Sequence, residues 1–235
     1  MPDKPRIVIV DALRGWAILM MVAYHIIFDI DYFGIGSIDL HSLPLLLFQR
    51  ATGSLFLLLA GVSIQLSERG NTEGYAHHLK RGLRLAGIAI LITIATWIYP
   101  HEGFITFGII HLIALSTIIA PFFLRFGKLN ALFGACVVAL GMLAAGMQSD
   151  SHQLFWLGLT YPGYTALDYY PLLPWFGVVL MGLCAGAVFF PHGEEARGSW
   201  IESRLAVLGR NSLLIYLVHQ PLIVGIMIAC KSIFG

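Results

Sequence analysis

Charged residues are scarce in this chain of 235 residues. They make up 11% of it, hydrophobic residues make up 58%, and the mean hydropathy is +0.81. Soluble domains carry about 25% charged residues. The shortage excludes an ordinary soluble domain and predicts an integral membrane protein, whose backbone is satisfied in lipid by helices. The net charge is only +1, so no nucleic-acid partner is indicated.

Cysteine is also rare. Cys136, Cys184 and Cys230 each lie in an apolar run, their number is odd, and no CxxC pair is present. Neither a disulfide framework nor a metal site is therefore predicted. The chain has no low-complexity tract, soluble segment or internal repeat, so we expect one domain over residues 1–235. It opens without a short apolar region and cleavage site, and we expect the first span to be retained.

Long apolar runs are what the sequence has instead. Each membrane span needs about 20 mostly apolar residues. Seven stretches qualify, at 15–33, 44–66, 83–99, 104–124, 129–147, 171–190 and 211–233. The segment 152–164 is apolar but short and ends in Pro and Gly, which favours a re-entrant or interfacial segment. The prediction is an all-α bundle of about seven transmembrane helices.

Basic residues alternate between the predicted loops. Twelve of the 14 fall on the side of the N-terminus: Lys4, Arg6, Arg14, Arg69, Lys80, Arg81, Arg84, Arg125, Lys128, Arg197, Arg204 and Arg210. The loops on the other side carry acidic residues instead. The positive-inside rule predicts a cytoplasmic N-terminus and an outer C-terminus.

The first span carries ionisable groups that are costly in lipid and normally face a bundle interior. At about 100° per residue, Arg14, His25 and Asp29 share one helical face, with Asp11 close to it. This polar stripe could mark a site. Asp11 and Arg14 could instead form a plain interfacial ion pair.

Other spans supply candidate partners. Arg50 lies about two turns into the second span, His111 about two turns into the fourth, and His219 near the middle of the last. We expect the three histidines at positions 25, 111 and 219 to converge in the outer half of one bundle, although each could form an ordinary interhelical hydrogen bond. His41 lies in the first outer loop. His77, His78 and His192 fall in cytoplasmic loops and are expected to be solvated.

A neutral imidazole can act as a general base or be acylated itself. A nearby carboxylate would fix its tautomer and stabilise the imidazolium. No GxSxG, HExxH, P-loop or dinucleotide motif is present. The residues alone therefore indicate a buried His/Asp/Arg site without naming its reaction.

Four segments in order carry a resemblance: "VDALRGWAILMMVAYHIIFD", "FGIIHLIALS", "DYYPLLPWFGVVLMG" and "GRNSLLIYLVHQP". Together they resemble the heparan-alpha-glucosaminide N-acetyltransferase-like family of membrane proteins. The resemblance runs from Arg6 to Pro221. It implies a multi-pass enzyme of the cell membrane that transfers an acetyl (acyl) group from cytoplasmic acetyl-CoA to a hydroxyl or amine of a sugar-type acceptor on the outer side. The lysosomal relatives are longer, so heparan sulfate is not expected as the acceptor.

The resemblance implies a role for each candidate. His25, Asp29 and His111 form the catalytic set, in which Asp29 orients His25. The substrate-binding set is Asp11, Arg14, Arg50, Asp168, Trp175, Arg210, Asn211 and His219. The resemblance also raises His41 as an alternative active histidine. Besides the CoA thioester and the acceptor, membrane lipid is a partner, and a homo-oligomer is left open.

Other classes of protein use similar residues. A small proton-coupled transporter could use the His/Asp/Arg set as a relay, but the inverted repeat typical of transporters is not seen. A haem electron carrier could use two of the three histidines.

Overall fold

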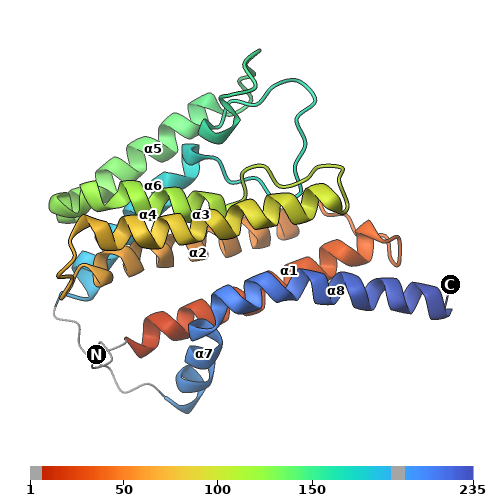
Figure 1. The fold of residues 1–235 in the computed structure, drawn as a ribbon, viewed down its shortest axis with the longest axis horizontal. Coiled ribbons are helices and arrows are strands. Elements are labelled where there is room, and N and C mark those ends of the chain that lie inside the picture. Colours follow the sequence, from red (N-terminus) through yellow and green to blue (C-terminus); the bar gives the residue numbers. More distant parts are fainter. Residues whose placement is uncertain (1–6, 192–198, 235) are drawn as a thin grey trace. The chain divides into compact units, whose positions relative to one another are not determined.

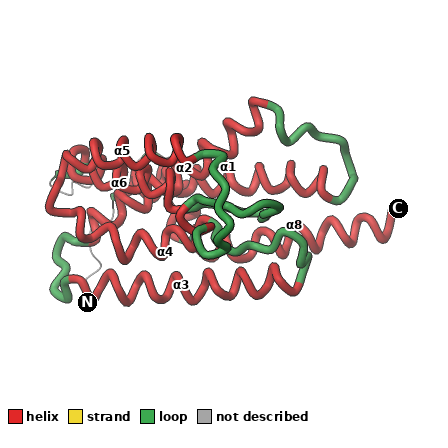
Figure 2. The backbone as a smooth tube through the Cα atoms, turned by 90° about the horizontal axis from the view of Figure 1, so that it is seen from above, coloured by secondary structure: helices red, strands yellow, loops and turns green. Residues whose placement is uncertain are grey.

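The computed structural model describes residues 7–191 and 199–234. Lys4, Arg6, His192 and Arg197, which entered the predictions of orientation and solvation, lie outside these residues. The described elements are helices joined by loops (Figures 1 and 2). They divide into two compact units, Met1–Phe56 with Gly193–Gly235, and Leu57–His192. The boundary falls inside one continuous helix, α2 (Leu43–Ser67).

The first unit contains α1 (Val8–Tyr32), the beginning of α2, α7 (Trp200–Arg210) and α8 (Ser212–Phe234). Helix α1 begins at Val8, seven residues before the predicted span. Asp11 therefore lies in its first turn, where a carboxylate interacts favourably with the helix dipole. Helix α7 was not predicted. It begins with a capping box, in which the Glu202 N–H donates to the Ser199 hydroxyl and the Glu202 carboxylate accepts the Ser199 N–H.

The second unit contains the rest of α2, α3 (Tyr75–Ile98), α4 (Ile109–Ile119), η1 (Ala120–Leu129), α5 (Asn130–Ala144), η2 (Phe155–Leu157) and α6 (Leu172–Phe189). Its helices approach closely at glycines. A Cβ on Gly61 would collide with the Val179 backbone, and one on Gly134 would collide with the Gly177 carbonyl. Small residues therefore allow the backbones of these helices to approach closely.

Six helices in the described residues are long and apolar enough to cross a membrane. One of them, Ile109–Ala144, takes in both the fourth and the fifth predicted spans. A straight helix of its 36 residues would be about 54 Å long, nearly twice the apolar thickness of a bilayer. At Gly127 the backbone turns to φ 49°, and α4 and α5 extend from η1 toward the same side in Figure 1. The chain therefore folds back on itself there.

The burial pattern is that of a membrane protein. Leu91, Ile98 and Leu143 are 64%, 72% and 78% exposed, although each lies in a long apolar helix. In contrast, the carboxylate-bearing residues Asp11 and Asp29 are 4% and 1% exposed. These three apolar side chains face outward and these two carboxylates face inward, as expected of a protein in a lipid solvent. The segment 152–164 contains only the short η2 and is not an eighth span, as predicted.

Candidate active site

An ion-pair cluster lies at the first turns of α1. The Asp11 carboxylate accepts a hydrogen bond from Arg14 Nη1 at 2.7 Å, and its second oxygen lies 3.5 Å from Arg210 Nε on α7. Asp11 is buried, whereas the side chains of Arg14 and Arg210 are 28% and 45% exposed. One buried carboxylate thus holds two guanidinium groups that remain accessible to water and to an anionic ligand.

Two glycines permit this arrangement. A Cβ on Gly15 of α1 would collide with the Leu205 carbonyl of α7, and one on Gly209 of α7 would collide with the Asp11 carbonyl of α1. The backbones of the two helices are therefore in direct contact. This close approach places Arg210, the last residue of α7, beside Asp11.

Two histidines meet farther along α1. The rings of His25 on α1 and His219 on α8 are edge to face, with centroids 4.7 Å apart. His25 Nδ1 bonds to the Met21 carbonyl at 2.8 Å, and His219 Nδ1 to the Tyr216 carbonyl at 2.6 Å. A carbonyl can only accept, so each Nδ1 carries a proton and each neutral ring has its lone pair on Nε2. His219 is 8% exposed, and its Nε2 has no hydrogen-bond partner among the described residues.

Asp29 lies one turn beyond His25, but its carboxylate is bound by another residue. Gln220 Nε2 donates to both of its oxygens, at 2.9 and 3.0 Å. The His25 ring is thus oriented by the Met21 carbonyl, and the orienting role predicted for Asp29 has no counterpart in these contacts. Sequence reasoning missed Gln220. Its position next to His219 and before Pro221 was the available signal.

His111 lies in the second unit and caps α4. Its Nδ1 accepts the Gly108 N–H at 3.2 Å. Its Nε2 lies 3.1 Å from Thr93 Oγ1, whose hydroxyl donates to the Ile105 carbonyl at 2.7 Å. Nε2 must therefore be the donor to Thr93, and both ring nitrogens are occupied. The catalytic role of His111 stays a prediction, and it requires that one of these bonds open.

Asp168 binds the same helix terminus. Its Oδ2 accepts the Ile109 N–H at 3.0 Å, and a Cβ on Gly108 would collide with this oxygen. Phe107 forms an isolated parallel β-bridge with Tyr169, and its carbonyl accepts the Tyr170 N–H. These backbone contacts hold the Asp168 loop in place. Burial raises the pKa of the Asp168 carboxyl to about 6. The helix N-terminus partly offsets this burial because its N–H groups favour a negative charge.

Aromatic rings surround this loop in the second unit. Tyr164 lies 5.0 Å from Tyr169 between ring centroids, and Trp175 lies 4.8 Å from Tyr170. The Tyr164 hydroxyl lies 2.6 Å from the Thr106 hydroxyl. Aromatic faces of this kind suit the apolar face of a sugar ring.

Three further predicted residues are exposed. Arg50 lies on α2 in the first unit. Asn211 directly follows α7, and its side-chain amide donates to the Val207 carbonyl. His41 lies in the loop between α1 and α2, where its backbone N–H donates to Asp39.

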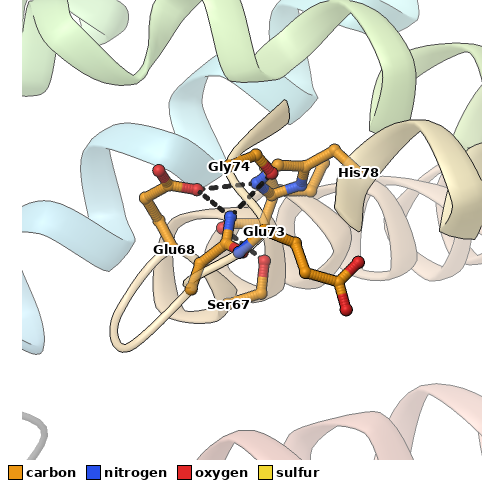
Figure 3. A network of polar contacts seen from close by, with 7 residues as sticks. Ser67, Glu68, Glu73, Gly74 and His78 are labelled. Carbon is orange, nitrogen blue, oxygen red and sulfur yellow. Dashed lines mark hydrogen bonds and ion pairs between the residues drawn. The ribbon is translucent and has the colours of Figure 1, made fainter. Parts of the chain in front are cut away.

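His78 differs from the prediction that it is solvated. It belongs to α3, is 1% exposed, and its Nε2 lies 2.8 Å from Glu68 Oε2 (Figure 3). Asn71 also donates to this carboxylate, across the turn that joins α2 to α3. The hydrogen bond from His78 holds the pKa of Glu68 below its usual range. His78 is buried because the turn folds back over the first turn of α3, a contact that local spacing does not predict.

These observations define an α-helical integral membrane protein with ionisable groups buried along its first span. The family model described as "Heparan-alpha-glucosaminide N-acetyltransferase, catalytic" matches residues 6–221. The chain belongs to this family, which is one of transmembrane acetyltransferases. Comparisons with curated proteins and with solved structures gave no match. The described residues contain no group of three or more His, Cys, Asp or Glu side chains placed to hold a metal ion.

Proposed function

We propose that this transferase moves an acetyl (acyl) group from acyl-CoA at the cytoplasmic face of the cell membrane to a hydroxyl or amine of a sugar-type acceptor on the outer side. The family supports a transferase over the alternative of a proton-coupled transporter. The observation that carries the mechanism is the His25 ring. Its Nδ1 is committed to Met21, and its Nε2 lone pair is left to accept a proton.

The donor binds at the cluster of Asp11, Arg14 and Arg210. The two partly exposed guanidinium groups suit the phosphates of CoA, and Asp11 keeps them in place. Arg14 and His25 are eleven residues apart, which is about 16 Å along α1. The extended arm of CoA is long enough to bring its thioester from the phosphates to this depth.

The acyl group then passes to the acceptor. His25 Nε2 takes the proton of the acceptor hydroxyl or amine as that atom attacks the thioester carbonyl. The new acyl bond forms, the carbon–sulfur bond breaks, and the departing thiolate receives the proton from His25 as CoA leaves. Asp29, one turn away, stabilises the transient imidazolium. His219 faces the same ring, and the two rings hold at most one proton because two adjacent imidazoliums repel.

Each of the two units contributes candidate residues for binding the acceptor. In the second unit, Asp168 and Trp175 lie among aromatic rings that fit a sugar. In the first unit, Arg50 is an exposed cation on α2.

The test uses the purified full chain in lipid nanodiscs with acetyl-labelled acetyl-CoA. Release of free CoA is measured alone, with glucose and with glucosamine. Acceptor-dependent release and a labelled sugar product support the proposal. Label that stays on the protein when no acceptor is present identifies an acyl-histidine route, and its absence identifies direct transfer. No CoA release with any acceptor, from protein that is folded, contradicts the proposed function.

Sidedness is tested in sealed proteoliposomes of known orientation. Acetyl-CoA is supplied on one side and glucosamine on the other. Transfer across the membrane in one orientation alone supports the proposal. Transfer with both substrates on the same side contradicts it.

A further inference from the structure

We propose that Gln220 is a positioning residue, which clamps α8 to α1 through Asp29 and thereby holds His219 against His25. This inference rests on the proposed function, because it assigns the clamp a role in acyl transfer. Gln220 lies 191 residues from Asp29 in the sequence and is outside every predicted set of site residues.

The clamp is a double hydrogen bond to a buried carboxylate. Gln220 Nε2 contacts both oxygens of Asp29, and Asp29 is 1% exposed. Hydrogen bonds to a charged group are shorter and stronger than neutral ones, and a low dielectric strengthens them further. The contact therefore fixes the position of α8 along α1.

The clamp and the histidine pair are adjacent on both helices. His219 directly precedes Gln220 on α8, and His25 lies one turn before Asp29 on α1. A shift of α8 that breaks the bond to Asp29 also moves the His219 ring away from His25. Because the rings touch edge to face at 4.7 Å, a small displacement separates them.

Stability alone does not favour a glutamine here. Gln220 Oε1 is buried and has no hydrogen-bond partner among the described residues. A buried carbonyl without a donor is a cost, which an apolar side chain of the same length avoids. What the amide supplies, and methionine does not, is a directed bond to Asp29.

The first test is kinetic and uses Gln220→Met in the full chain, with acetyl-CoA and glucosamine as substrates. We expect kcat to fall about 10- to 100-fold, since small misplacements of reacting groups have effects of this size. The KM for acetyl-CoA should stay unchanged, because Asp11 lies 18 residues, or about five turns, from Asp29 on α1. An unchanged kcat, or a loss confined to KM, overturns the proposal.

Gln65→Met is the matched control. Gln65 also buries an Oε1 without a hydrogen-bond partner among the described residues, but it lies on α2 in the second unit, beside Gly186. The substitution removes the same buried amide and should leave kcat unchanged. An equal fall in kcat in both variants means that the loss is one of general packing, and the proposal fails.

The second test measures the clamp without activity, by thermal unfolding. Gln220→Glu places a second carboxylate beside Asp29 and should lower Tm by repulsion. Adding Asp29→Asn exchanges the two roles, because the new amide at position 29 can donate to the new carboxylate at position 220, and Tm should recover. Strictly additive effects of the two changes would show that the residues do not interact.

The two tests also separate this inference from the proposed function. If the unmodified, folded chain releases no CoA with any acceptor, the proposed function fails, whatever the thermal cycle shows. If His25→Ala abolishes transfer and Gln220→Met does not reduce it, the clamp alone is refuted.

Discussion

His25 and His219 lie edge to face, 4.7 Å between ring centroids, and each ring is fixed by a bond from its Nδ1 to its own helix. Both rings thus present Nε2 as the atom able to accept a proton. We expect His25→Ala to lower acetyl transfer about 100- to 10,000-fold, the usual effect of losing a general base. Acetyl-CoA should still bind, as measured by calorimetry on the same preparation.

His41→Ala is the opposing experiment. His41 is exposed in the loop between α1 and α2, where its backbone N–H, and not its ring, binds Asp39. If His41→Ala abolishes transfer and His25→Ala retains more than about a tenth of it, far from the loss expected for a base, His25 is a packing residue and His41 the active histidine.

Arg14→Ala should weaken CoA binding. One charge-assisted contact is worth about 1.5–3 kcal/mol, a factor of roughly ten to one hundred in Kd. Arg204→Ala is the control, because this arginine lies over the Trp200 ring on α7 and is not part of the Asp11 cluster. An unchanged Kd in folded Arg14→Ala protein, or an equal effect of Arg204→Ala, removes Arg14 from the donor site.

Gly209→Ala should separate α7 from α1. The added methyl group meets the Asp11 carbonyl, and overpacking of this kind typically costs about 1–3 kcal/mol. Arg210 should then move off Asp11, so that Tm falls and CoA binding weakens together. Gly225→Ala on α8 is the matched control, since a Cβ there has open space and should be neutral or slightly stabilising. Equal behaviour of the two variants would rule out the close contact at Gly209.

Asp168 should make stability depend on pH. Because burial raises its pKa to about 6, the folded chain keeps a proton that the unfolded chain releases near pH 4. Stability should therefore fall as the pH rises from about 4 to about 6, and then level off. In Asp168→Asn the amide oxygen can still accept the Ile109 N–H, and this fall should be smaller. The check is Tm measured as a function of pH. If the unmodified chain and Asp168→Asn show the same dependence of Tm on pH, the assignment is contradicted.

The orientation can be tested with single cysteines in a chain from which the three native cysteines are removed. Glu73 is exposed in the turn between α2 and α3, and Glu102 is exposed in the loop after α3. A membrane-impermeant thiol reagent should label Glu102→Cys in intact cells and Glu73→Cys only after permeabilisation. Labelling of Glu73→Cys from outside would refute a cytoplasmic N-terminus.

Much of the fold was predictable because its signals are local. Apolar runs predicted the positions of the spans, and the i, i+3 spacing of Asp11 and Arg14 gave their ion pair as one of two alternatives. The capping box of Ser199 and Glu202 is likewise a local signal, and it marks the beginning of α7. The reversal of the chain at Gly127 was also predicted, because it falls between the fourth and fifth predicted spans, 104–124 and 129–147.

What the sequence by itself determined is the class of protein and the polar stripe on α1, since composition and helical periodicity depend only on neighbouring residues. Tertiary structure decided the partners. Gln220 binds the Asp29 carboxylate, and His219 packs against His25. Both ring nitrogens of His111 form hydrogen bonds, and His78 is buried beneath the turn between α2 and α3. These contacts join residues on different helices or across turns, and no spacing along one helix specifies which side chains will meet when helices pack.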